Sequence, residues 1–98
     1  MASLSTHVLD AAAGGPWPGV LVTVHDEAGQ LVASATTGAD GRASPLAADL
    51  PLARYRINWE TGGKFLAAVS VTVALTEERH YHVPLLASPA SAVAYLGA

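Results

Sequence analysis

The sequence predicts an all-β domain built from two packed sheets. Its β-branched and aromatic residues occur in short runs, and glycine, proline and aspartate separate these runs, which is typical of a sandwich or barrel. With 98 residues, the chain has the size of a single domain, residues 1–98, with one core. We expect eight strands, enough for two sheets: Leu4–Asp10, Val20–His25, Leu31–Thr37, Arg42–Leu46, Arg54–Glu60, Phe65–Leu75, His80–Leu86 and Ala92–Leu96.

The breaks between the predicted strands carry turn residues. The first break, AAGGPWPG at residues 12–19, cannot hold a regular ladder, because proline lacks an amide donor and glycine favours turns. The alanine-rich PLAADLPLA at residues 45–53 has room for one helical turn between its prolines. We expect tight turns at DEAG, GADG and ETGG, which are residues 26–29, 38–41 and 60–63.

The composition predicts that another subunit covers part of the surface. Hydrophobic residues make up 51% of the chain and charged residues 13%, which is more apolar than a solitary domain of this size requires. The net charge of −3 and the five scattered basic residues argue against nucleic-acid binding, because phosphates demand a basic face.

The sequence also limits where the protein is located and which side-chain chemistry it can use. No basic stretch followed by an apolar segment opens the chain, and no apolar run approaches the roughly 18 residues of a membrane span. We therefore expect a cytoplasmic protein without membrane contact. The chain contains no cysteine, which excludes disulfides, thiolate nucleophiles and cysteine-based zinc sites.

Two of the predicted strands, LSTHVLD and HYHVPLL, each place imidazole on one face. Side chains alternate across a strand, so His7 lies on the face opposite Val8, and His80 and His82 share the face opposite Tyr81. If the apolar faces form the core, these histidines lie on the outer face of a sheet, where a partner subunit can cover them.

His7, His82 and Arg42 are the candidate catalytic residues. Histidine, with a pKa of about 6.5, can take up and return a proton near neutral pH. A guanidinium presents a planar fork of donors to an oxyanion or an imide-like ring. Two bases and one such anchor suffice to hydrolyse an activated cyclic amide without a metal or a covalent intermediate. The alternative is a zinc site made by His7, His80 and His82, since His-x-His on a strand directs two rings the same way.

Four segments resemble, in order and spacing, the transthyretin-related family of 5-hydroxyisourate hydrolases. They are LSTHVLD, TGADGR, LPLARYRINWETG and HYHVPLLASP, at residues 4–10, 37–42, 50–62 and 80–89. The resemblance covers nearly the whole chain, and the first and last segments are its most specific parts.

The resemblance implies an eight-stranded, transthyretin-like (prealbumin-like) sandwich of two four-stranded sheets, with the family's short helix reduced or absent. It implies a homotetramer, a dimer of dimers, with active sites in a channel where outer sheets face each other. His7 and His82 correspond to the family's catalytic histidines and Arg42 to its substrate-binding arginine, whereas His80 lacks the main catalytic role. The implied reaction hydrolyses the N1–C6 amide bond of 5-hydroxyisourate, giving 2-oxo-4-hydroxy-4-carboxy-5-ureidoimidazoline in urate breakdown, without a cofactor.

The C-terminal tail departs from the family's Tyr-Arg-Gly-Ser. It reads Tyr95, Leu96, Gly97 and Ala98. The substrate-binding positions implied there are Tyr95, Leu96 and Ala98, of which Leu96 lacks a charge and Ala98 lacks a hydroxyl. Each polar group of a buried substrate left without a partner costs about 1 to 3 kcal/mol. Two alternatives follow. One is an enzyme of the same fold redirected to a less polar cyclic substrate, and the other is a non-catalytic small-molecule binding protein like transthyretin, against which the retained histidines argue.

Overall fold

The computed structural model describes residues 1–97, and within this range every regular element is a strand. None of the described chain therefore forms a helix that could cross a membrane. The strands are β1 (Ala2–Asp10), β2 (Gly15–Pro16), β3 (Leu21–His25), β4 (Leu31–Thr36), β5 (Arg42–Leu50), β6 (Arg54–Glu60), β7 (Val69–Ala74), β8 (His80–Ala87) and β9 (Ala92–Ala94).

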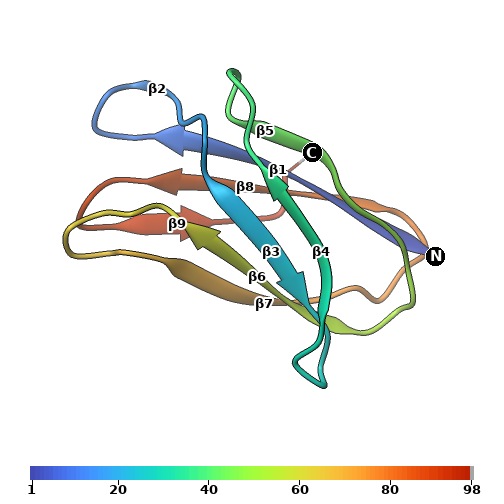
Figure 1. Cartoon of the computed structure of the whole chain (residues 1–98). Coiled ribbons are helices and arrows are strands. Elements are labelled where there is room, and N and C mark those ends of the chain that lie inside the picture. Colours follow the sequence, from blue (N-terminus) through green and yellow to red (C-terminus); the bar gives the residue numbers. More distant parts are fainter. Residues whose placement is uncertain (98) are drawn as a thin grey trace.

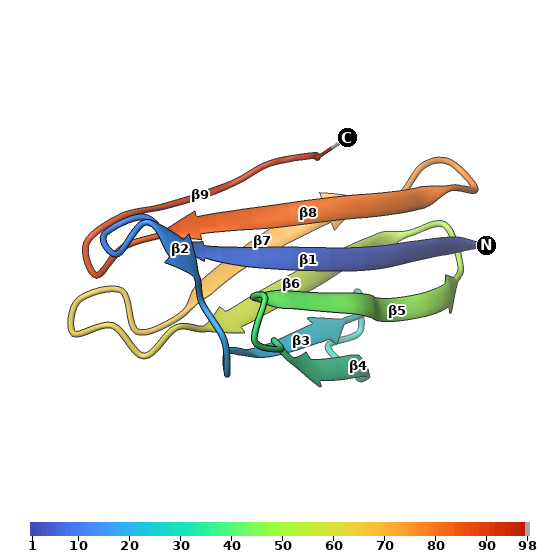
Figure 2. The ribbon, with the colours of Figure 1, turned by 90° about the horizontal axis from the view of Figure 1, so that it is seen from above.

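The strands form two packed sheets, as predicted (Figure 1). One sheet has the order β2-β1-β8-β9, with β5 also paired to β1, and the other has the order β4-β3-β6-β7. β1 is the central strand of the first sheet, because it runs antiparallel to β5 on one edge and parallel to β8 on the other. Figure 2 shows β8, β1 and β5 side by side in one layer. This layer carries the predicted site residues.

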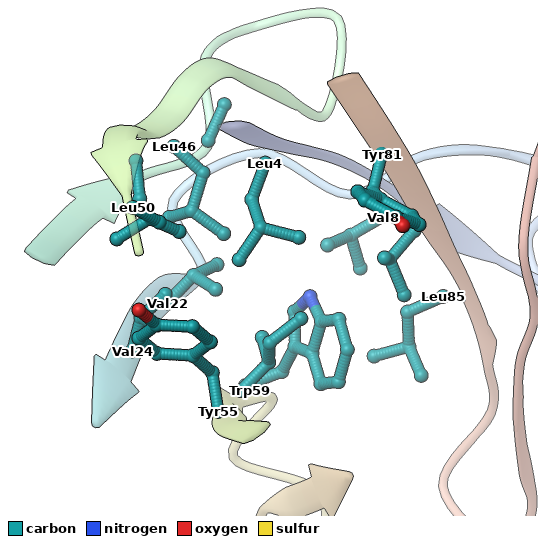
Figure 3. Close-up of a cluster of buried hydrophobic side chains, with 14 of the residues drawn as sticks. Leu4, Val8, Val22, Val24, Leu46, Leu50, Tyr55, Trp59, Tyr81 and Leu85 are labelled. Atoms are coloured by element: carbon teal, nitrogen blue, oxygen red, sulfur yellow. The ribbon is translucent and has the colours of Figure 1, made fainter. Parts of the chain in front are cut away.

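The apolar faces of the two sheets meet in one core (Figure 3). Trp59 of β6 is its largest fully buried side chain. The indole Nε1 of Trp59 donates to Thr6 Oγ1 at 3.1 Å, and that hydroxyl donates to the Val83 carbonyl at 2.7 Å. The buried hydroxyl is thus satisfied and links both sheets. The same core includes Leu4, Val8, Val22, Val24, Tyr55 and Leu85.

β5 is longer than predicted and replaces the helical turn expected at residues 45–53. It continues to Leu50, because Ala47 pairs with Leu4 and Leu50 pairs with Ala2 along the edge of β1. This pairing buries Leu50 in the core. Tertiary burial here outweighs the helical preference of an alanine-rich segment.

β7 is shorter than predicted. It begins at Val69, not at Phe65, because residues 61–68 form a loop in which Gly62 N–H donates to the Ala67 carbonyl at 2.8 Å. Phe65 is 80% exposed and packs on neither sheet. Residues 65–68 have a composition that suits a strand, but none of the described strands pairs with them.

Proline decides two other strand boundaries. Residues 12–19 form only the two-residue β2, as expected of a stretch that cannot hold a regular ladder. β9 ends at Ala94, not at Leu96 as predicted. Beyond Ala94 the chain faces Pro84, which has no N–H to donate, although Tyr95 N–H still donates to the Pro84 carbonyl at 3.3 Å.

Candidate functional site

The outer face of the sheet formed by β2, β1, β8 and β9 carries the candidate site. Parallel pairing sets Ser5 on β1 opposite His82 on β8, and alternation directs both side chains away from the core. On the other edge of β1, Arg42 at the start of β5 pairs with His7. The structure thus brings His7, Arg42 and His82 onto one face. They come from β1, β5 and β8, which are neighbouring strands in Figure 2.

A tight turn holds Arg42 beside His7. Gly41 N–H donates to the Gly38 carbonyl at 2.9 Å and closes the predicted GADG turn. His7 Nε2 lies 2.9 Å from the Asp40 carbonyl oxygen. A carbonyl oxygen only accepts, so Nε2 carries a proton and the Nδ1 of neutral His7 keeps its lone pair. The Asp40 carboxylate accepts from the backbone N–H of Arg42 at 2.9 Å, which fixes the start of β5.

His82 is half-buried, and its surroundings disfavour the charged ring. Burial, followed by the positive charges of Arg42, His7 and His80, lowers the pKa of His82 below the usual imidazole value of about 6.5. The ring is therefore neutral at physiological pH. A neutral imidazole with a free nitrogen can act as a general base.

His80, the exposed ring beside His82 on β8, is held by two hydroxyls. Ser3 Oγ lies 2.7 Å from its Nδ1, and Ser5 Oγ lies 2.7 Å from its Nε2. Both ring nitrogens therefore already have partners. Among residues 1–97, no three His, Cys, Asp or Glu side chains are grouped so as to hold a metal ion, so the positions of His7, His80 and His82 do not support the zinc alternative.

The C-terminal tail runs back along β8 and passes the histidines. Gly97 N–H donates to the His82 carbonyl at 2.7 Å, and a Cβ on Gly97 would lie 2.9 Å from His82 Cδ2. Tyr95 and Leu96 line an apolar hollow of about 270 Å³ between β7 and β8. Their contact with substrate stays a prediction, and Ala98 lies outside the described residues.

Ser3, Ser5 and Asp40 contact the histidines of the candidate site although they were not predicted as site residues. The serines lie on the same alternating face of β1 as His7, and SLSTH contains that signal. The sequence does not reveal that β8, from the other end of the chain, lies beside them. Asp40 contacts His7 through its backbone carbonyl. Every residue has such a carbonyl, so the residue type does not predict this contact.

Sequence comparison finds similar proteins along the whole chain. Residues 4–97 match the model of the HIUase/Transthyretin family. The chain is 37% identical to the 5-hydroxyisourate hydrolase of Caulobacter vibrioides, over an alignment of 114 positions that covers 99% of each chain. It is 32% identical to the 5-hydroxyisourate hydrolase of Halalkalibacterium halodurans, with 96% of each chain covered. These alignments are longer than this chain, so they include segments that it lacks.

Two solved structures share the fold. The 5-hydroxyisourate hydrolase of Klebsiella pneumoniae superposes with a TM-score of 0.90 at 33% identity, over 100% of both chains. Sea bream transthyretin, solved in complex with thyroxine, has a TM-score of 0.88 at 26% identity and covers 97% of this chain and 94% of its own. The same sandwich thus occurs in a protein named as a hydrolase and in one that binds thyroxine.

Proposed function

Because the chain belongs to the HIUase/Transthyretin family, we propose that it hydrolyses 5-hydroxyisourate. The reaction opens the ring by cleavage of a cyclic amide and gives 2-oxo-4-hydroxy-4-carboxy-5-ureidoimidazoline in urate degradation. The observation that carries the proposal is similarity over the full length of proteins named 5-hydroxyisourate hydrolase. The common face of His7, Arg42 and His82 adds a chemical reason.

In the proposed reaction, His82 takes a proton from the water that attacks the amide carbonyl. Its lowered pKa keeps the ring neutral and ready to accept that proton. Arg42 holds the heterocycle and the oxyanion that develops on the attacked carbonyl. The proton ends on the departing ring nitrogen, returned by His82 or His7, so the roles proposed for these residues need no metal or cofactor.

We also propose a homotetramer, a dimer of dimers, that works in the cytoplasm. The candidate site lies on an outer sheet face, and within residues 1–97 β7 and β9 are the edge strands on one side of the sandwich. A second copy could pair with these edges. A chain without cysteine has no disulfide for a reducing compartment to break. Exposed apolar side chains that a partner would cover are Leu86, Val93, Tyr95 and Leu96.

Ring opening of freshly generated 5-hydroxyisourate, followed by ultraviolet absorbance, tests the activity. We expect rapid decay with the wild type and a rate about 10²- to 10⁴-fold lower for His82→Ala, the usual effect of losing a general base. His25→Ala, which alters a histidine of β3 in the other sheet, is the matched control and should stay active. A wild type no faster than the spontaneous reaction would refute the proposal.

The tail favours a second candidate, an enzyme for a less polar cyclic substrate. Leu96 and Ala98 stand where the resemblance implies a charge and a hydroxyl that hold the substrate, and the tail contains no arginine. The variant Leu96→Arg with Ala98→Ser restores a charge and a hydroxyl. Hydrolysis of 5-hydroxyisourate by this variant but not by the wild type would favour the redirected enzyme. Thyroxine binding by an inactive wild type would instead favour a binding protein.

A further inference from the structure

Four side chains on the site face form one hydrogen-bonded series, named here the serine–histidine chain: Ser3, His80, Ser5 and His82. Ser3 Oγ lies 2.7 Å from His80 Nδ1, and Ser5 Oγ lies 2.7 Å from His80 Nε2. Ser5 Oγ also lies 2.8 Å from His82 Nδ1. The series therefore runs from an exposed ring to the half-buried His82.

The parallel pairing of β1 with β8 builds the serine–histidine chain. The register sets Ser3 opposite His80 and Ser5 opposite His82. The Ser3 hydroxyl therefore lies beside the His80 ring, and the Ser5 hydroxyl lies beside both rings. Ser5 is only 3% exposed, and its hydroxyl contacts two imidazole nitrogens. Because a hydroxyl has one proton to donate, Ser5 cannot donate to both rings and must accept from at least one of them.

When both rings are neutral and Ser5 donates its proton to one of them, the series can run in two directions. In the first, His82 Nδ1–H donates to Ser5, Ser5 donates to His80 Nε2, and His80 Nδ1–H donates to Ser3. This direction leaves a lone pair on His82 Nε2. In the second, every bond is reversed and His82 Nε2 carries the proton. The partner at one ring nitrogen thus decides whether the other nitrogen can act as a base.

We propose that Ser5 and His80 are positioning residues that hold His82 in the form with an unprotonated Nε2, ready to accept a proton from water. This inference rests on the proposed function, in which His82 is the base. Ser5 is buried under the rings, so it acts through His82 and not by touching the substrate. A variant of Ser5 should therefore change turnover more than substrate binding.

Ser5→Ala removes the acceptor of the His82 Nδ1 proton. We expect the nitrogen-15 shifts of the His82 ring to move toward the Nε2–H form. We also expect kcat to fall about tenfold, the value of one hydrogen bond, with KM unchanged. Ser5→Thr keeps a hydroxyl at the same atom and should restore both. The control is Ser34→Ala, an exposed serine of β4 in the other sheet.

Two further variants keep the test decisive. His82→Ala identifies the His82 signals, and His80→Ala breaks the same series at an exposed ring if Ser5→Ala fails to fold. An unchanged His82 tautomer in the folded variants overturns the inference, and so does a rise in KM at constant kcat. An inactive wild type would refute the proposed function separately, because the nitrogen-15 signature is read without substrate.

Discussion

The surroundings of His82 show how position changes the chemistry of one side chain. Half-burial and three positively charged or chargeable neighbours lower its pKa, while Ser5 occupies its Nδ1. The histidine itself was predicted as a site residue. Its burial and its contact with Ser5 were not, because they depend on strands distant in the sequence. A residue type therefore predicts which reactions a side chain can perform, and its neighbours set its pKa and its hydrogen bonds.

Arg42→Gln should raise the pKa of His82. It removes a positive charge that disfavours the imidazolium. Because the Arg42 side chain is 51% exposed, salt should diminish the difference between variant and wild type. A nuclear magnetic resonance titration of the ring measures the shift, with Arg56→Gln on β6 as the control. An unchanged pKa would mean that the charge of Arg42 does not contribute to the lowering.

The sign of the pH dependence follows from the same lowered pKa. The unfolded chain takes up the His82 proton near pH 6.5, and the native chain does so only at a lower pH. The contribution of His82 to the free energy of unfolding therefore falls as the pH drops below about 6.5. For wild-type hydrolysis, the acid limb of kcat/KM against pH, which reports the free enzyme, should likewise lie below pH 6.5, and an acid limb above that value would contradict the role of His82 as the base.

At the scale of one element, the GADG turn places the arginine. Gly41 has a φ of +78°, a conformation that favours glycine. A Cβ there would collide with the Val8 carbonyl oxygen and lie 3.1 Å from Trp17 N. Val8 N–H also donates to the Gly41 carbonyl at 2.7 Å. Glycine is thus required both for the turn and for close contact with β1.

Gly41→Ala should lower the free energy of unfolding by about 2 to 4 kcal/mol, since backbone strain and the collision both contribute. Gly14→Ala is a matched control, because Gly14 has a φ of +77° with nothing within 4 Å of an added Cβ. It should cost only about 1 kcal/mol. Urea denaturation measures both. Equal losses would show that strain, and not the contact with β1, makes glycine necessary.

Strand ends were less predictable than strand positions. The turn at residues 38–41 was confirmed because its signal is local, in Asp40-Gly41. β5 extends to Leu50 because it borders β1, whereas β7 begins only at Val69 because no strand pairs with the preceding loop. Each end depends on a partner strand that composition does not specify.

At the scale of the whole molecule, the single chain leaves its site face and the edge strands β7 and β9 without a partner strand on their outer side within residues 1–97. Val93 on β9 is 58% exposed and pairs with Leu86, which is 41% exposed. This apolar surface lies on the sheet that carries the histidines. A partner covering it would also bury the site and shield the proposed reaction from bulk water.

Sedimentation equilibrium tests the tetramer. We expect a tetramer for the wild type and smaller species for Val93→Asp, because a carboxylate in an apolar interface is costly to bury. Leu31→Asp is the matched control, since Leu31 is also 58% exposed and lies on β4, the edge strand away from β9. It should remain tetrameric. A monomeric wild type with full activity would remove the need for a shared site.

The sequence alone determined the all-β class, most strand positions, the outward face of His7 and His82 and the altered tail. These features are encoded locally, in side-chain alternation and in turn residues. Only the tertiary structure decided that β8 pairs in parallel with β1, which puts Ser5 between two rings and half-buries His82. The physical reason is that partner choice and burial depend on contacts between Ser5 and His82, at opposite ends of the chain, and no local pattern records them.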